Sequence, residues 1–440
     1  MLGRRLFGLI CVAAVGVMAY AALAWRPTIA PIDPPAPQSF APDLVAKGKV
    51  LASAGNCATY HTAPDSGKAF AGGLAMPTPF GTIYTTNITP DRETGIGQWS
   101  LAAFTRALRE GVARDGKHLF PAFPYDHFTL LTDDDIGALY AYLMTVPPVI
   151  ARARPNTVPF PIDIRALQAG WKMLYFKPEP FRPDPAKSEA WNRGAYLAEG
   201  LAHCGACHTP RNILGAESVG HPYFGAKIEN DWWALPLHIT FSPQRWTEDE
   251  LATFLRGGTT IHGRAKGPMG PVIQALSALP ESDIRAIATY FGDQIRPHSA
   301  QPDVLAAEVL ARSRAHDGAM DDRGRQLYYA ACASCHDDGG STPLATRMEL
   351  TLSSALWFPW PNNFVLAVLD GVGGPTDAPG PLMPGFRNAL SDAEIIAIGD
   401  YLRRDRLHQS VWPPYVYKVD RMRDNPPPKP AETAAQPKPH

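Results

Sequence analysis

The sequence predicts a mainly α-helical protein, built from three tandem small α-helical domains with Pro-rich connections and an N-terminal hydrophobic helix. Three observations support this prediction: one pattern of short helices and glycines recurs three times, 45 prolines are spread through the 440 residues, and a long uncharged run lies near the N-terminus. A chain of this length is too long for a single small core. We expect the domains at residues 40–150, 188–298 and 318–408, and an extended, solvated tail at 425–440.

The N-terminal residues 1–26 indicate export. Arg4 and Arg5 precede an uncharged run from Leu6 to Trp25, which is long enough to cross a bilayer. The end of the run, residues 22–24, also has the small-residue pattern at which signal peptides are cleaved. The segment is therefore either a membrane anchor or a signal peptide. In both cases the arginines stay cytoplasmic and the remaining chain is exported.

The charge balance argues against nucleic acid as a partner. The formal net charge is −1, and only 19% of the residues are charged. Nucleic-acid-binding domains usually present a strongly basic surface. We therefore expect no nucleic-acid binding.

Two cysteine motifs indicate covalently attached haem. Residues 204–208 read CGACH and residues 332–336 read CASCH. A histidine directly after a CxxC pair is the attachment signature of c-type haem, and neither a disulfide nor a zinc site requires that histidine. The cysteines bond the haem, and the histidine is placed to bind its iron. The predicted residues are Cys204, Cys207, Cys332 and Cys335 for attachment, and His208 and His336 as iron ligands.

A third, incomplete motif lies at residues 57–61, which read CATYH. The residues around it keep the register of the other two copies. A basic residue followed by glycine precedes each motif: Lys47-Gly48, Arg193-Gly194 and Arg323-Gly324. We therefore predict a third haem c, attached through Cys57 only, with His61 as the iron ligand.

Two further helices follow each motif. The first ends in a glycine that can adopt the left-handed cap conformation: Phe104 to Gly111, Leu251 to Gly258 and Phe364 to Gly371. The second, the closing helix, reads acid-Ile-x-Ala-Leu/Ile-x-x-Tyr-Leu/Phe at 135–143, 283–291 and 394–402. A single amphipathic helix is ordinary core, but its threefold recurrence at a similar offset predicts repeated domains.

The same register predicts the second axial ligands. Met269 follows Gly258 by eleven residues, and Met383 follows Gly371 by twelve. Methionine is a frequent second ligand of electron-transfer haems, so we predict Met269 and Met383 as iron ligands. The equivalent residue of the first domain is Phe123, which cannot bind iron.

Several alternatives remain for the first iron. His127 lies four residues beyond Phe123 in the same loop and is a candidate ligand, or else a loop histidine hydrogen-bonded near Asp126. Met76 is a candidate from another loop. The iron can also be five-coordinate, or the haem absent.

With these motifs, the chain resembles the triple-haem cytochrome c subunits of membrane-bound dehydrogenases of acetic acid bacteria and their relatives, which oxidise alcohols, aldehydes or sugars. The most specific segments are residues 77–91, 191–196 and 204–212, and the resemblance extends from about residue 48 to 402. The loop at 121–127 looks most like that of cytochromes serving aldehyde dehydrogenases. Tyr60 and Phe123 depart from the family pattern.

The resemblance implies a non-catalytic, electron-carrying subunit. A separate dehydrogenase catalytic subunit, with molybdenum and iron–sulfur centres, a flavin or a quinone, would oxidise the substrate. This chain would pass the electrons to ubiquinone at the periplasmic face of the bacterial cytoplasmic membrane. The family pattern makes His208 with Met269, and His336 with Met383, the axial pairs.

The alternative function is a haem enzyme, peroxidase-like or sulfur-oxidising, that uses an open iron in the first domain. Catalysis at haem needs an open coordination position. The second and third domains, with methionine available, do not offer one.

Overall fold

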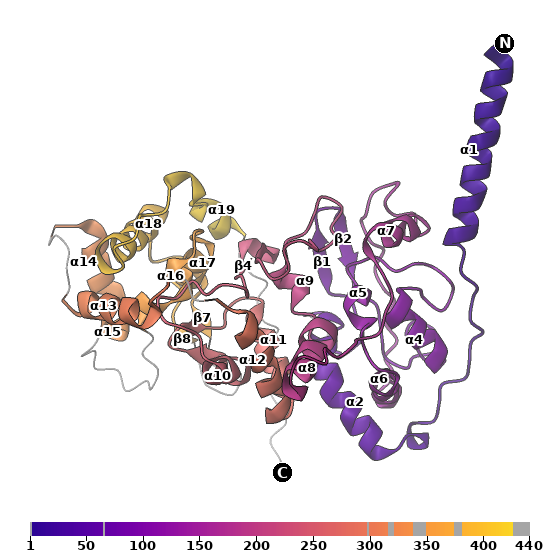
Figure 1. Cartoon of the computed structure of the whole chain (residues 1–440), viewed down its shortest axis with the longest axis horizontal. Coiled ribbons are helices and arrows are strands. Elements are labelled where there is room, and N and C mark those ends of the chain that lie inside the picture. The colour runs from indigo at the N-terminus through magenta and orange to yellow at the C-terminus, as the bar shows by residue number, and fades with distance from the viewer. Residues whose placement is uncertain are drawn as a thin grey trace.

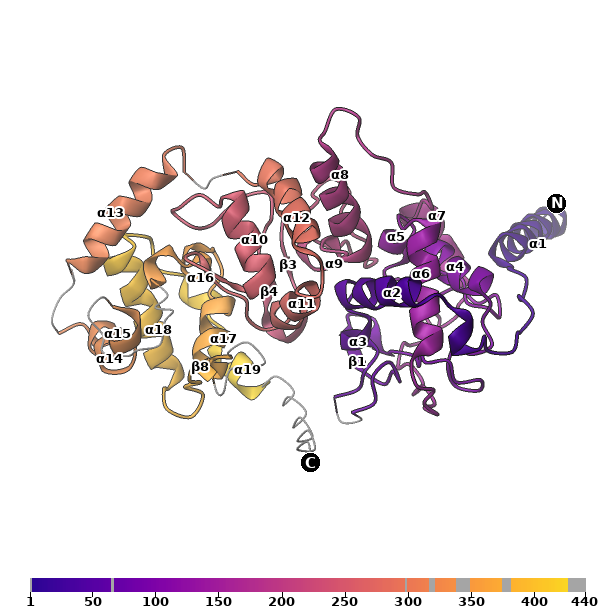
Figure 2. The same ribbon diagram turned by 90° about the horizontal axis from the view of Figure 1, so that it is seen from below.

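The computed structural model describes residues 2–64, 67–296, 299–315, 321–337, 349–373 and 381–425. About half of the chain is helical, as predicted, and the strands form only short antiparallel pairs. Figures 1 and 2 show three groups of helices that follow one another along the long axis of the molecule. Apart from Asn425, the predicted tail lies outside the described residues.

The N-terminal helix α1 (Leu2–Ala24) projects away from the rest of the protein (Figure 1). Its span Arg5–Ala24 is long and apolar enough to cross a membrane, with a mean hydropathy of 2.4. The apolar side chains along it are exposed. Exposure of such a stripe in water is costly, which is consistent with an anchor or a signal sequence.

The first group of helices lies next to α1. It contains α2 (Pro42–Ala54), α3 (Cys57–Tyr60), the hairpin β1 (Ala75–Thr78) and β2 (Gly81–Tyr84), α4 (Leu101–Glu110), α5 (Tyr125–Phe128), α6 (Asp133–Thr145) and α7 (Leu167–Tyr175). Local sequence determines where these helices begin: Ser100 and Thr132 cap α4 and α6 by accepting hydrogen bonds from the amides of Ala103 and Asp135.

The second group repeats this order. It contains α8 (Glu189–Ala195), a π-helical turn (Tyr196–Leu201), α9 (Gly205–His208), β3 (Ala226–Lys227), β4 (Trp233–Ala234), α10 (Glu248–Gly257), β5 (Thr259–Thr260), β6 (Gly263–Arg264), α11 (Met269–Leu276) and α12 (Glu281–Gln294). Thr247 and Glu250 form a capping box at the start of α10.

The third group lies at the other end of the molecule. It contains α13 (Pro302–Arg314), α14 (Arg323–Ala331), α15 (Ala333–His336), α16 (Ser354–Trp357), α17 (Asn362–Asp370), β7 (Val372–Gly373), β8 (Pro381–Met383), α18 (Asp392–Tyr401), a π-helical turn (Leu402–Arg406) and α19 (Val419–Asp424). Short 3-10 turns occupy Pro37–Ser39, Glu229–Asp231, Leu350–Leu352 and Pro414–Val416.

The same close helix pair occurs once in each group. Gly48 of α2, Gly194 of α8 and Gly324 of α14 face the carbonyl oxygens of Ala138, Ala286 and Ala397 in α6, α12 and α18. A Cβ atom at these glycines would lie 1.9, 1.9 and 2.0 Å from those oxygens. Only glycine allows the two backbones to come this close. The glycine that precedes each motif in the sequence is therefore a helix-packing residue.

The hydrophobic core is not divided into three. Buried side chains of the first and second groups, such as Leu51, Leu143, Leu197 and Ile287, belong to one continuous cluster. A separate cluster fills the third group and includes Trp232, which comes from the second. Thus the first two groups share one core, and the core of the third includes a side chain of the second.

We expect the substitution Gly194→Ala to destabilise the protein, because its methyl group would overlap the Ala286 carbonyl oxygen. Overpacking of this kind costs about 1–3 kcal/mol. The matched control is Gly137→Ala in α6, where nothing lies within 4 Å of the added Cβ and alanine should stabilise the helix by about 0.5–1 kcal/mol. Thermal unfolding followed by circular dichroism measures both. Equal unfolding temperatures for the two variants would contradict the packing role of Gly194.

Candidate functional site

Each of the three cysteine motifs forms a single helical turn that follows the first helix of its pair, either directly or after a π-helical turn. The turns are α3, α9 and α15. In each, the amide of the histidine donates to the carbonyl of the cysteine four residues earlier, at N···O distances of 2.9, 3.0 and 3.1 Å for His61, His208 and His336. Residues four apart lie on one helical face. The incomplete first motif thus keeps the backbone geometry of the complete ones.

The histidine rings of the first two motifs are held in the tautomer that iron needs. The Nδ1 atom of His61 lies 2.6 Å from the Thr86 carbonyl oxygen, and that of His208 lies 2.6 Å from the Leu235 carbonyl oxygen. Since a carbonyl only accepts, Nδ1 carries the proton. Burial lowers the pKa of both rings, so they are neutral with a free Nε2 lone pair. These residues fit a haem iron.

The cysteines fit thioether attachment better than the alternatives. None of the six cysteines, all of which lie in the described residues, forms a disulfide. Burial raises the pKa of Cys57 and Cys204 to about 12, and that of Cys207 and Cys332 to about 11. A thiolate metal site requires deprotonated sulfur, which this burial opposes.

The two candidate methionines follow a glycine with positive φ in both repeats, and of these Gly258 alone has the predicted left-handed cap conformation. Gly258 and Gly371 end α10 and α17 with φ of 72° and 75°. Met269 then starts α11, behind Gly267, whose φ of 51° brings its backbone against the Trp232 ring. Met383 ends β8, where it pairs with Val372. Both methionines are partly buried. Their chain positions are equivalent, although one starts a helix and the other ends a strand.

In the first group, the equivalent loop has Phe123 in place of the methionine. The Phe123 ring contacts that of Phe128, with centroids 5.4 Å apart. The other candidate, Met76, lies in strand β1 and pairs with Ile83.

His127 connects the first and second groups of helices. Its Nδ1 atom lies 2.6 Å from the Glu199 carbonyl oxygen, and its Nε2 atom lies 2.9 Å from Glu217 Oε1. Burial alone would lower its pKa, but the hydrogen bond and negative charge of Glu217, with Asp126, raise it to about 9. With both nitrogens engaged, the arrangement favours the hydrogen-bonded interpretation of His127. Iron ligation by it stays a prediction and would require the bond to Glu217 to break.

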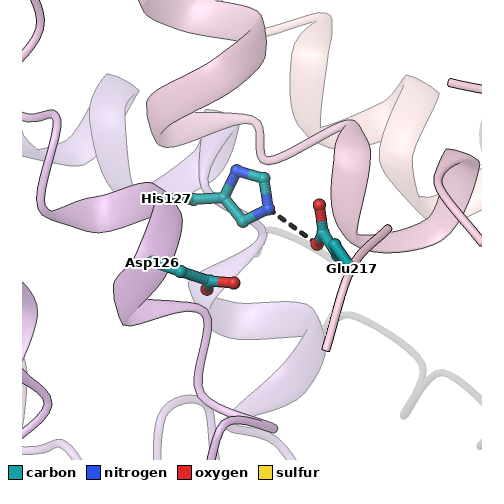
Figure 3. A group of neighbouring side chains, drawn as sticks. All are labelled: Asp126, His127 and Glu217. Carbon is teal, nitrogen blue, oxygen red and sulfur yellow. Dashed lines mark hydrogen bonds and ion pairs between the residues drawn. The ribbon is translucent and has the colours of Figure 1, made fainter. Parts of the chain in front are cut away.

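Figure 3 shows Asp126, His127 and Glu217 converging from α5 and from the segment after α9. Their ligand atoms lie within 4.8 Å of one another, a spacing at which such groups can hold a metal ion. Arg211 lies 3.5 Å from Glu217 Oε1 and adds a positive charge beside the cluster. Sequence reasoning did not find Glu217, because it lies 90 residues from His127 and has no repeated counterpart.

The first and second motifs meet across the same interface. The ring of Tyr60, which replaces the second cysteine of the first motif, packs edge-on against His203, with centroids 6.2 Å apart. His203 directly precedes Cys204 and also contacts Phe128, at 5.7 Å. The sequence predicts no role for His203, since no repeat carries a histidine there. An aromatic cluster therefore extends from the loop that lacks methionine to the second cysteine motif.

Comparison with known proteins shows which family the chain resembles. Residues 319–402 match the family model described as cytochrome C oxidase, cbb3-type, subunit III. A nicotinate dehydrogenase subunit of Pseudomonas putida is 43% identical over 418 residues, which is 94% of this chain but 34% of that protein. The chain thus spans about a third of that relative's length.

Other relatives are matched over most of their length. The fructose dehydrogenase cytochrome subunit of Gluconobacter japonicus is 38% identical, over 84% of this chain and 80% of the relative. The gluconate 2-dehydrogenase cytochrome c subunit of Pantoea cypripedii is 37% identical, over 82% and 85%. These matches confirm the resemblance stated from the motifs and the prediction of haem c. The chain belongs to the family of cytochrome c subunits of dehydrogenases.

Proposed function

We propose that this chain is an electron relay of three cytochrome c domains, at residues 40–150, 188–298 and 318–408. The observation that carries the proposal is the helical turn with cysteine and histidine, repeated three times behind the same glycine-packed helix pair. Bound haem c supplies reversible one-electron transfer at each turn. The chain's own residues attach it, orient the histidines and bring the sites together. The axial pairs are His208 with Met269, and His336 with Met383.

The first haem is attached through Cys57 alone, with His61 as its ligand. The hydrogen bond from His61 Nδ1 to the Thr86 carbonyl matches that of His208 in the complete motif, which supports a retained iron site. Tyr60 cannot form a thioether, and its contact with His203 brings the first site next to the second. This contact supports electron exchange between the first two haems.

Electrons enter from a dehydrogenase catalytic subunit and leave to ubiquinone at the periplasmic face of the membrane. Several relatives are named as cytochrome subunits of dehydrogenases, which supports the first partner. The exposed helix α1 supports a membrane location. The loop at 121–127 looks most like that of cytochromes serving aldehyde dehydrogenases. The proposed partner is therefore an aldehyde-oxidising subunit with molybdenum and iron–sulfur centres.

Contacts at the end of α1 favour an anchor over a cleaved signal. His118 Nε2 lies 2.8 Å from the carbonyl oxygen of Ala24, the last residue of the helix. The Tyr20 hydroxyl donates to the Ala166 carbonyl at 2.8 Å and accepts from the Gly170 amide at 3.1 Å. Cleavage before Trp25 would remove all of these bonds, so the helix end is part of the folded structure.

A second candidate function is haem catalysis at the first iron. Phe123 replaces the methionine, and both nitrogens of His127 have partners. A five-coordinate first iron would therefore be open to a small ligand.

Replacing Met269 or Met383 with alanine should lower the midpoint potential of the corresponding haem, on the order of 100 mV within the ~0.8 V range that axial ligands span. Ubiquinone reduction by the reconstituted complex should slow in parallel. Val304→Ala, at a valine of α13 that is 52% exposed, is the control and should change neither. Spectroscopic redox titration measures the potentials. Unchanged midpoints in both variants would remove the ligand assignment.

The first haem should give a pyridine haemochrome band shifted to the red of the other two, because one vinyl group stays unreacted. Tyr60→Cys should remove the shifted component without changing the haem count. Two covalent haems by mass spectrometry, with no extractable third, would contradict this attachment. Carbon monoxide binding at one reduced iron would favour the haem-enzyme alternative, whereas no binding would favour the relay.

The mature protein should retain Met1 and require detergent for extraction. Tyr20→Phe, which loses both bonds of the hydroxyl, should leave the helix in place but make the following module easier to cleave by protease. N-terminal sequencing and limited proteolysis provide the measurements. A mature sequence beginning near Trp25 would show that the helix is a signal peptide.

A further inference from the structure

Helix α7 lies against the end of α1 that meets the folded part of the protein (Figure 1). The Tyr20 hydroxyl bonds to Ala166 and Gly170, and a Cβ atom at Gly170 would lie 3.2 Å from that hydroxyl oxygen. Tyr20 belongs to the apolar span Arg5–Ala24. If that span crosses the membrane, as in the proposed function, α7 is held at the bilayer surface.

The segment containing α7 exposes an unusual number of apolar side chains. Phe160, Met173 and Leu174 are 79%, 66% and 70% exposed. Single exposed apolar residues are common on protein surfaces, but a concentration of them marks an interaction site. Four more large apolar residues of this segment are exposed: Ile162, Ile164, Leu167 and Tyr175. Apolar side chains at this level of the membrane suit the boundary between headgroups and acyl chains.

A hollow of about 450 Å³ lies between α7 and the end of α1. Apolar side chains line it, among them Leu23, Met173 and Phe176, together with the cationic side chains of Arg26 and Lys172. It therefore combines an apolar wall with positive charge at the end of a membrane-length helix.

In the described part of the chain, Arg26 and Lys172 bond to backbone carbonyls and a histidine rather than to carboxylates. Lys172 is 8% exposed, and its Nζ atom bonds to the carbonyl oxygens of Glu110 and Gly111, the latter at 2.7 Å, and to His118 Nδ1 at 3.1 Å. These three bonds use all the N–H groups of its ammonium. Arg26 bonds to the carbonyl oxygens of Leu23 and Trp25. Within the described ranges, neither cation forms an ion pair. Burial, together with the charge of Arg26 and opposed by that of Glu110, lowers the pKa of Lys172 to about 7.

Among the described residues, the other charged side chains of the hollow form no ion pair with Arg26 or Lys172. Arg109 and Glu179 are bound to Asp133 and Lys177, at 2.8 and 3.0 Å. Glu110 is exposed, and its charge offsets only part of the cationic charge, since it raises the pKa of Lys172 against the larger effect of burial. A bound anion would offset the repulsion between Arg26 and Lys172.

We propose that this hollow binds the headgroup of an anionic phospholipid, and that residues 160–175 lie beside it at the periplasmic surface of the cytoplasmic membrane, where lipid headgroups meet water. The phosphate would pair with the Arg26 guanidinium, near the positive charge of Lys172, and the acyl chains would run along α1 and the exposed side chains of α7. Basic pockets next to membrane helices recognise anionic lipids in this way. The apolar walls favour a lipid over free phosphate, and the unpaired cations favour an anionic lipid over an uncharged amphiphile.

The test uses the full-length haem-loaded protein, reconstituted into nanodiscs of phosphatidylcholine alone or with one quarter phosphatidylglycerol. Native mass spectrometry counts the retained phospholipid, and hydrogen–deuterium exchange measures protection of residues 160–176. We expect phosphatidylglycerol to be retained preferentially and to protect this segment. Arg26→Gln should weaken that preference about fivefold, the equivalent of one basic residue near an anionic surface. Lys49→Gln, an exposed lysine of α2, should leave it unchanged.

A second pair of variants tests the apolar contact. Leu174→Gln should increase exchange in residues 160–176, because its side chain is 70% exposed to solvent or lipid rather than part of the core. Val304→Gln, at a 52% exposed valine of α13 at the other end of the molecule, is the matched control. Neither substitution removes a buried side chain, so both variants should fold.

Three results would overturn the proposal: equal retention of the two lipids, displacement of the lipid by millimolar inorganic phosphate, or retention of a quinone in its place. Haem content and midpoint potentials of the same samples report on the relay separately. Loss of ubiquinone reduction with intact lipid preference would reject the relay and leave the lipid site standing. A mature chain beginning near Trp25 would reject the lipid site and leave the relay standing.

Discussion

Three helix pairs in this protein depend on one kind of contact, the packing of a glycine against the backbone carbonyl of an alanine. Gly48, Gly194 and Gly324 occupy the same place in α2, α8 and α14. Each of these helices leads directly, or through a π-helical turn, into the turn that carries cysteine and histidine. The distance between the paired helices therefore sets the position of the histidine in each cysteine motif. A side chain at the glycine would displace the turn as well as the helix.

Local sequence patterns predicted much of this arrangement. The predicted closing helices at 135–143 and 283–291 lie within α6 and α12. The third, at 394–402, lies in α18 and extends to the first residue of the following π-turn. Periodicity, capping residues and glycine positions act over a few turns of chain, so they are readable in a single sequence. The neutral tautomers of His61 and His208 could not be predicted from the sequence. The carbonyl groups that fix them belong to Thr86 and Leu235, which are 25 and 27 residues away.

Contacts between the groups of helices could not be predicted from the repeat. His127 bonds to Glu217, and Tyr60 packs against His203, although each pair comes from different repeats. A repeat identifies what the copies share, whereas an interface uses residues in which they differ. The first group differs most: its loop without methionine contributes Phe128 and His127 to the contact with the second. The loop that lacks the methionine of the other two repeats is therefore the loop that contacts the second group.

The continuous core shared by the first two groups has a consequence for the speed of internal electron exchange. Two modules with one core cannot separate without unfolding part of that core, which makes large relative motion rare. Exchange between the first two sites would then proceed through a fixed medium, independent of solvent viscosity. The third group is also tied to the second, because Trp232 belongs to its core and Trp233 bonds to Asn363 through backbone and amide groups at 2.9 Å. Exchange across that second junction would then also be insensitive to solvent viscosity.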